Sequence, residues 1–238
     1  MACLEYFQAR LPKSMRSSPL LGFLVALTAL LFSAPAACAE NEAPRLVVLG
    51  DSLSAGYGIH PEEGWVALLS RRLGKEGYGY RVVNASVSGE TSGGGLARLP
   101  RVLATHHPAV LVVELGANDG LRGLPLAELR KNLATIVSTA QAAHVAVLLI
   151  GMRIPPNYGP EYTSGFTNSF GEVSMALHTA LVPFLLERVA ASDANFQSDG
   201  LHPIASVQGL LLDTVWPMLK PLLHAGAAAA AAPPAARR

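Results

Sequence analysis

The sequence has only two cysteines, and both lie near its beginning. Cys3 and Cys38 precede residue 40, so the chain that follows contains no thiol. This excludes disulfide bonds and cysteine chemistry from residues 40–238. A domain of this length buries enough apolar surface to fold without such cross-links, which suits an exported protein of a bacterial periplasm.

A clear excess of charge of either sign is also missing. The whole chain has 18 basic and 17 acidic residues. Removing Arg10, Lys13, Arg16 and Glu5, which precede residue 40, takes these numbers to 15 and 16, a net charge of −1. A chain with so little net charge has no electrostatic reason to bind a polyanion such as nucleic acid.

The apolar run at residues 20–32 is shorter than the about 20 residues that a membrane-spanning helix needs. Three basic residues precede it, and Ala37-Cys38-Ala39 follows it with the small-x-small pattern of a cleavage site. We therefore expect residues 1–39 to be a signal peptide that is removed, and the protein to be periplasmic or secreted without stable insertion in a membrane.

The N-terminal segment has two alternative interpretations, and the C-terminal segment differs from the rest of the chain in composition. A lipoprotein anchored through Cys38 competes with simple export, although Pro35 stands where such a site normally has a large aliphatic residue. Met15 is an alternative start. Residues 225–238 are mostly alanine and proline and are predicted to be a low-complexity, disordered tail. Residues 40–224 then form one domain.

Strand-like and helix-like segments alternate within this domain. Continuous apolar runs favour strands that are buried on both faces, whereas helical spacing of apolar residues favours helices. Strands are predicted at residues 45–49, 80–85, 109–115, 145–152 and 181–185, and helices at 65–75, 96–105, 126–143, 166–177 and from Pro203 towards Leu223. Pro217 is expected to bend the last helix. The order predicts an α/β fold with a parallel sheet covered on both faces.

Polar residues follow the predicted strands, where parallel α/β sheets place their sites. Ser52 follows the first strand, and Gly89, whose N–H no side chain covers, follows the second. Asn118 follows the third strand, and Asp199 and His202 follow the last one. Four loops therefore bring chemically useful groups to one edge of the sheet.

These groups suit acyl transfer. A serine hydroxyl is a weak nucleophile, so it needs a base within hydrogen-bond reach and a third group that fixes the tautomer of the base. His202 is the candidate base for Ser52, and Asp199 is its candidate partner. The amides of Ser52 and Gly89 and the side-chain NH₂ of Asn118 are candidate donors to a developing oxyanion.

Four short segments resemble, in the same order, the four blocks of the SGNH, or GDSL, hydrolases: Gly50-Asp51-Ser52-Leu53-Ser54, Ser88-Gly89-Glu90-Thr91, Gly116-Ala117-Asn118-Asp119 and Asp199-Gly200-Leu201-His202-Pro203. Residues 45–223 most resemble the bacterial periplasmic thioesterase I/protease I/lysophospholipase and arylesterase group. The resemblance implies a three-layer α/β/α, flavodoxin-like fold with a five-stranded sheet and no cofactor. It also implies that Ser52, Asp199 and His202 are catalytic and that Gly89 and Asn118 complete the oxyanion hole.

The resemblance implies acyl thioesters, lysophospholipids and aryl esters as substrates. Separately, we expect the protein to be a monomer. Two loops, residues 120–125 and 155–159, resemble walls of the acyl-chain site in these relatives. Their candidate substrate contacts are Leu121, Arg122, Gly123, Leu124, Pro125, Pro156 and Tyr158. A role as ordinary connecting loops is the alternative for both. No segment between the motifs is long enough for a cap domain, so we expect broad specificity.

Two other functions remain open. A carbohydrate acetylesterase would prefer acetyl groups to longer acyl chains. A non-catalytic envelope protein that binds lipid or glycan would keep the scaffold without hydrolysis. The complete set of Ser52, Asp199 and His202 favours an enzyme, because a binding protein has no need of all three.

The other ionisable residues are assigned structural roles, and no metal site is predicted. His106 and His107 end a predicted helix, where the helix dipole stabilises them, and His60, His144, His178 and His224 are expected to be structural or exposed. Asp51 and Asp119 are expected to brace their turns. Glu114 has two interpretations, a buried carboxylate near the site or a residue at a strand end.

Overall fold

The computed structural model of the protein describes residues 43–223. The predicted signal peptide at residues 1–39, with its alternatives at Met15 and Cys38, lies outside the described residues, as do His224 and the predicted tail. None of the helices at residues 43–223 is both long enough and apolar enough to cross a membrane.

Five parallel strands form a single sheet in the order β2-β1-β3-β4-β5. The strands are β1 (Arg45–Gly50), β2 (Arg81–Asn84), β3 (Val110–Glu114), β4 (Ala146–Ile150) and β5 (Ala180–Val182). All of β3 and nearly all of β1 are buried, because helices cover both faces of the sheet. The predicted five-stranded parallel sheet is confirmed.

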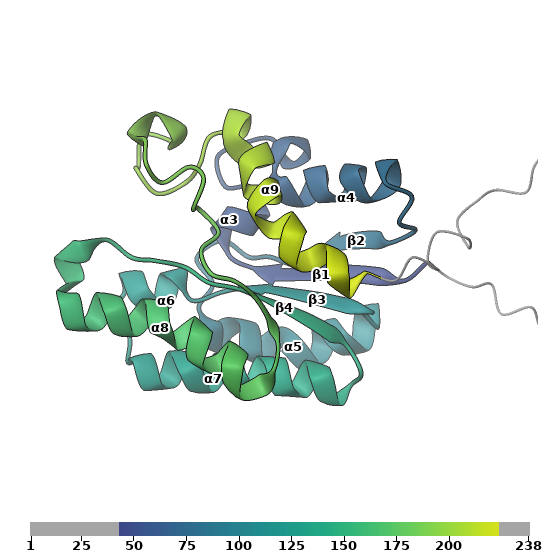
Figure 1. Cartoon of the computed structure of the whole chain (residues 1–238), viewed down its shortest axis with the longest axis horizontal. Coiled ribbons are helices and arrows are strands. Elements are labelled where there is room, and N and C mark those ends of the chain that lie inside the picture. The colour runs from purple at the N-terminus through teal and green to yellow at the C-terminus, as the bar shows by residue number, and fades with distance from the viewer. Residues whose placement is uncertain (1–42, 224–238) are drawn as a thin grey trace, which may run out of the picture. The chain divides into compact units, whose positions relative to one another are not determined.

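The helices form two layers, one on each side of the sheet (Figure 1). On one side lie α4 (Trp65–Lys75) and α9 (Gln208–Leu219), which contact each other, and on the other side lie α5 (Ser92–His106), α7 (Leu126–Ala142) and α8 (Pro160–Leu177). Trp65, Phe166 and Phe170 are almost fully buried in these layers. Burying one such side chain contributes about 1.5–3 kcal/mol, so packing of the two helix layers stabilises the sheet.

Two helices begin before the predicted positions. α5 begins at Ser92 rather than residue 96, because the Thr91 hydroxyl accepts a hydrogen bond from the amide of Gly94 and caps the helix. The glycines in its first turn concealed this start. α8 begins at Pro160 rather than residue 166, since proline suits the first position of a helix.

The last helix begins after the predicted position. Pro203 forms an isolated antiparallel bridge with Phe196, and α9 begins at Gln208. The bridge stabilises the loop that contains the Asp199 block. Strand β5 ends at Val182, because Pro183 has no N–H for the ladder. Pro217 lies inside α9, and the bend predicted there stays a prediction.

Several short elements have no periodic signal in the sequence and were not predicted. They are α3 (Ser52–Ala55), α6 (Ala117–Leu121) and the 3₁₀ helices η2 (Pro61–Glu63), η3 (Pro156–Tyr158), η4 (Asp193–Asn195), η5 (Ala205–Val207) and η6 (Lys220–Leu222). Two of these, α3 and α6, directly follow central strands of the sheet and present the first residues of the candidate site.

The histidines outside the predicted site within residues 43–223 lie at or near the ends of elements. His106 is the last residue of α5, as predicted. His60, His144 and His178 are exposed, which confirms the structural or exposed role expected for them. Within residues 43–223, no group of three or more histidine, cysteine or acidic residues could hold a metal ion.

Candidate active site

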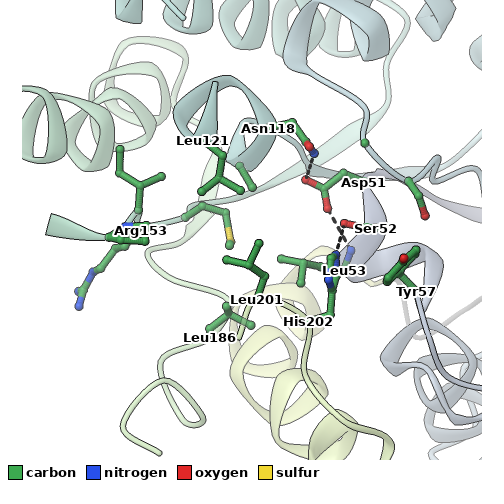
Figure 2. Close-up of a pocket in the computed structure, with 16 residues that line it drawn as sticks. Asp51, Ser52, Leu53, Tyr57, Asn118, Leu121, Arg153, Leu186, Leu201 and His202 are labelled. Carbon is green, nitrogen blue, oxygen red and sulfur yellow. Dashed lines mark hydrogen bonds between the residues drawn. The ribbon is translucent and has the colours of Figure 1, made fainter. Parts of the chain in front are cut away.

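Ser52, His202 and Asp199 lie in one hydrogen-bonded row. The Ser52 Oγ is 2.8 Å from the Nε2 of His202, and the Nδ1 of the same imidazole is 2.7 Å from the Oδ2 of Asp199. Figure 2 shows Ser52 and His202 facing each other at the edge of a cavity. The structure therefore brings together three residues that are up to 150 positions apart in the chain.

Ser52 stands on a rigid turn between β1 and α3. The Asp51 carboxylate accepts a hydrogen bond from the amide of Leu53 at 3.0 Å and caps α3, of which Ser52 is the first residue. A Cβ on Gly50 would lie 2.8 Å from the side chain of Ser54. Glycine is required there, because the strand and the short helix approach so closely.

The loop between η4 and η5 positions the carboxylate and the imidazole. The Asp199 Oδ1 accepts hydrogen bonds from the amides of Leu201 and His202, at 2.9 and 3.1 Å. The hydrogen bond from the Leu201 amide, and next the side-chain hydrogen bond with His202, lower the pKa of Asp199 to about 2. Asp199 is therefore ionised near neutral pH and accepts the Nδ1–H of the imidazole.

Tyr57 and Gln197 support His202 from the other side. The Tyr57 ring packs against the imidazole with 4.6 Å between ring centroids. The Gln197 amide donates to the carbonyl of His202 at 2.8 Å, and its side-chain Nε2 donates to the carbonyl of Tyr57 at 2.8 Å. Since these contacts link the loop after α3 to the loop with His202, they limit rotation of the imidazole.

The predicted oxyanion donors line the same cavity as the Ser52 hydroxyl. Gly89 has a φ of 79°, a left-handed conformation that glycine adopts readily. The Asn118 Nδ2 donates to the Oδ2 of Asp51 at 3.1 Å and to the carbonyl of Glu90 at 3.0 Å. Both contacts aim the amide, and an oxyanion would share or replace one of them.

Sequence reasoning missed the ion pair beneath the Gly89 turn. The Arg98 guanidinium donates to the Glu90 carboxylate, which is almost buried, and to the carbonyl of Ala85 at 2.9 Å. This contact links both ends of the turn to α5. Arg98 is eight positions after Glu90, and this spacing alone predicts no contact across a turn and a helix start.

Asp119 also braces its turn, as predicted, but through α5 rather than through its own backbone. Its carboxylate accepts hydrogen bonds from the amide and the hydroxyl of Ser92, at 2.7 and 2.5 Å. The contact joins the first turn of α6 to the first turn of α5. The turns that contain Asn118 and Gly89 are therefore fixed relative to each other.

An apolar cavity of about 240 Å³ adjoins Ser52. Figure 2 shows Leu121, Leu186 and Leu201 gathered around it, and Arg153 with its guanidinium turned away. The aliphatic residues that line the cavity are Leu53, Ala117, Leu121, Met152, Ile154, Pro155, Leu186 and Leu201. Such a lining accommodates an acyl chain beside the serine.

Two residues of the predicted wall loops, Leu121 and Pro155, line this cavity. The other candidate contacts do not line it, and their contact with an acyl chain stays a prediction: Arg122, Gly123, Leu124, Pro125, Pro156 and Tyr158. Two of these support the site from behind. Arg122 donates to the carbonyl of Gly89 at 2.8 Å, and the Tyr158 hydroxyl donates to the carbonyl of Leu121 at 2.7 Å.

Residues 48–208 match the model of the GDSL-like Lipase/Acylhydrolase family. The chain belongs to this family. This GDSL-like hydrolase is 54% identical over 184 residues to the esterase TesA of Pseudomonas aeruginosa. The matched residues cover 77% of this chain and 92% of the relative. It is 40% identical over 177 residues to an arylesterase of Vibrio mimicus, which covers 74% and 88%. It is 39% identical over 202 residues to the thioesterase 1/protease 1/lysophospholipase L1 of Escherichia coli K12, covering 85% and 91%.

Solved structures agree with this assignment. A crystal structure of TesA superposes with a TM-score of 0.74 and covers 75% of this chain and 99% of that one, at 54% identity. The SGNH-hydrolase family esterase AlinE4 superposes with a TM-score of 0.64 and covers 77% and 98%, at 39% identity. The GDSL-like chain is therefore an enzyme that hydrolyses acyl esters, with the α/β fold of its neighbours.

We expect Asn118→Ala to lower kcat about 10²–10³-fold with a smaller change in KM, because loss of one oxyanion donor acts mainly on the transition state. Steady-state hydrolysis of a p-nitrophenyl ester measures both constants. Asn168→Ala removes an exposed amide on α8 and is the control. A loss confined to KM would show that Asn118 binds the ground state of the substrate instead.

Proposed function

We propose that Ser52 is the nucleophile, His202 the general base and Asp199 the group that fixes the tautomer of His202, in an enzyme that forms an acyl-serine intermediate. The observation that supports this most is the 2.8 Å contact between the Ser52 Oγ and the His202 Nε2. That distance lies within hydrogen-bond reach of a base and its nucleophile. Membership of the GDSL-like family supports the same roles.

The proposed reaction has two halves. The Ser52 Oγ attacks the acyl carbon while His202 accepts its proton, and the negative oxygen that forms faces the amides of Ser52 and Gly89 and the side chain of Asn118. His202 then gives its proton to the leaving alcohol or thiol. In the second half, His202 removes a proton from water, which attacks the acyl carbon. The bond between that carbon and the Ser52 Oγ then breaks, His202 returns the proton to the Oγ, and the carboxylic acid leaves.

The substrates proposed are acyl thioesters, lysophospholipids and aryl esters. The relatives support this choice, since their names include esterase, arylesterase, thioesterase and lysophospholipase. The apolar cavity beside Ser52 supports an acyl chain longer than acetyl, because acetate would leave most of its about 240 Å³ unfilled.

We further propose that the protein acts as a monomer in the periplasm or outside the cell, after removal of residues 1–39. Support comes from the order of basic residues, apolar run and Ala37-Cys38-Ala39 at the start of the chain. N-terminal sequencing of the protein from a periplasmic fraction tests the cleavage site. A mature chain that begins at a lipid-modified Cys38 contradicts soluble export.

A series of p-nitrophenyl esters of increasing acyl length tests the substrate proposal. We expect kcat/KM to rise from acetate to longer chains and Ser52→Ala to be inactive throughout. Activity on acyl-CoA and lysophospholipid is then measured directly. Strict preference for acetate would instead indicate an acetylesterase.

We expect Leu121→Ala to reduce the preference for a long acyl chain over acetate about 10-fold, since it removes apolar contact area from the wall of the cavity. The ratio of kcat/KM for the long and acetyl esters measures this preference. Leu210→Ala is the control, because Leu210 is an exposed leucine on α9 that does not line the cavity. An unchanged ratio would place the acyl chain elsewhere.

A further inference from the structure

Glu114 is a buried carboxylic acid directly beneath the turn with Ser52. It is the last residue of β3, pairs in register with Gly50, and has no exposed surface. Its Oε2 accepts a hydrogen bond from the Ser54 Oγ at 2.7 Å and lies 3.4 Å from the amide nitrogen of Asp51. Glu114 therefore meets both interpretations, because it is a buried carboxylate near the site and also lies at the end of its strand.

The space around Glu114 is closely fitted. A Cβ on Gly50 would lie 2.9 Å from the Glu114 Oε2. The other carboxyl oxygen, Oε1, is buried and has no hydrogen-bond partner within residues 43–223. An ionised carboxylate without a partner for one oxygen is costly at such a position, whereas an un-ionised carboxyl group has an O–H donor, for which the neighbouring Asp51 carboxylate is an acceptor.

A second buried carboxylate lies beside it. Asp51 has no exposed surface, and N–H groups contact both of its oxygens, since Oδ1 accepts from the amide of Leu53 and Oδ2 accepts from Asn118. Such contacts favour the ionised form. The two carboxyl groups therefore have unequal surroundings, and a single proton belongs on Glu114 rather than on Asp51.

The charges near the pair agree with this assignment. Burial raises the pKa of Asp51 to about 6, and hydrogen bonds and His202 oppose the rise. Burial, and next the charge of Asp51, raise the pKa of Glu114 well above its usual range. Within residues 43–223, the ionisable groups found to act on this pair are its own two members and His202, which acts on Asp51.

We propose that Glu114 is a positioning residue that keeps the proton of the Glu114–Asp51 pair. Un-ionised Glu114 accepts a hydrogen bond from the Ser54 hydroxyl of α3, and Asp51 is then the ionised member of the pair. Asp51 then caps α3, which presents Ser52, and also aims Asn118. One proton thereby aligns the nucleophile with an oxyanion donor. The catalytic part of this inference rests on the proposed roles of Ser52 and Asn118.

The proton makes folding depend on pH in a defined direction. As pH rises above about 4.5, Glu114 ionises in the unfolded chain but keeps its proton in the folded one. The folded state then binds more protons than the unfolded state, so its stability falls with pH until Glu114 ionises in the folded protein as well. Glu114→Gln has the same shape and cannot ionise, so it lacks this dependence.

Thermal unfolding of the two proteins between about pH 4.5 and 8.5 tests the proton. We expect the Tm of Glu114→Gln minus that of wild type to increase by about 3 °C per pH unit over part of this range. Glu128→Gln is the matched control, because Glu128 is an exposed carboxylate in the first turn of α7, and its difference should stay constant. A constant or decreasing difference for Glu114→Gln would show that Glu114 is ionised when folded and would overturn the proposal.

Kinetics test the positioning role separately. We expect Glu114→Ala to lower kcat at least about 10-fold with little change in KM, since α3 loses its support and Ser52 moves. Glu114→Gln should recover most of that loss. If Glu114→Ala does not fold, Ser54→Ala removes the same hydrogen bond and should lower kcat in its place.

Equal losses in Glu114→Gln and Glu114→Ala would overturn the role of the un-ionised acid. Unchanged kcat in Glu114→Ala, or in Ser54→Ala where that variant replaces it, would overturn the positioning role. Failure of the proposed function is recognised independently, because Ser52→Ala would then stay active. The pH dependence of Tm does not rely on catalysis and would be unaffected.

Discussion

Replacing Ser52 with alanine is expected to lower kcat at least about 10⁴-fold and to leave the fold intact, because the acyl-enzyme route needs the hydroxyl itself. The Ser52 Oγ contacts the imidazole of His202. Removing this Oγ leaves the cap of α3 in place, because the cap comes from Asp51. Hydrolysis of a p-nitrophenyl ester, with a thermal melt of both proteins, measures the two effects. The residual rate then reports what the oxyanion donors and substrate binding contribute alone.

Ser138→Ala is the matched control for Ser52→Ala. Ser138 is an exposed serine on α7, and its hydroxyl donates to a backbone carbonyl of its own helix. Activity retained in Ser52→Ala with an unchanged melt would remove Ser52 from the nucleophile role. A fluorophosphonate should also label wild type at Ser52, and failure to label folded protein would favour a lipid- or glycan-binding function.

The sheet was predictable because buried parallel strands leave a simple pattern. Val110–Glu114 and Ala146–Ile150 lie in nearly continuous apolar runs, and both were found within a few residues. The starts of α5 and α8 were not found, because their first turns contain glycine or polar residues. A cap from Thr91 and a proline at position 160 define those starts, and neither produces apolar periodicity.

The row of Ser52, His202 and Asp199 was predictable for a different reason. Each residue follows a predicted strand, and the topology of a parallel sheet brings such positions to one edge. The walls of the cavity were not predictable in the same way. Leu186 lies far from Leu121 in the sequence and belongs to none of the four blocks, and Leu201, inside the Asp199 block, has no pattern that predicts a cavity wall. Their meeting depends on the course of loops, which side-chain packing determines.

The contacts of Glu114 could not be predicted from the local sequence. The sequence places a carboxylate inside an apolar strand, which is unusual, but gives no partner for it. The partners are Ser54 and Asp51, about 60 positions earlier, and the contact exists because β1 and β3 are neighbours with Gly50 opposite Glu114. Register between strands is therefore the information that the sequence pattern lacked.

The tautomer of His202 determines the second large effect. We expect Asp199→Asn to lower kcat about 10⁴-fold with little change in KM or fold. The Asp199 Oδ1 accepts hydrogen bonds from the backbone amides of Leu201 and His202, and Oδ2 faces the Nδ1 of His202. An asparagine would keep its oxygen at the Oδ1 position and turn its NH₂ towards that Nδ1. The imidazole would then accept at Nδ1 and carry its proton on Nε2, facing Ser52, where it cannot act as a base.

Asp193→Asn separates this effect from the loss of one negative charge, because Asp193 is an exposed carboxylate in the same loop region. We expect that control to keep full activity.

In wild type, the pKa of Asp199 is about 2, so this carboxylate stays ionised as the pH falls to about 4, and protonation of Asp199 does not contribute to a decrease of activity over that range. If Asp199→Asn retained most of its kcat, the tautomer of His202 would be fixed by another group. The packing of Tyr57 against the imidazole, at 4.6 Å between ring centroids, would then be the next contact to remove.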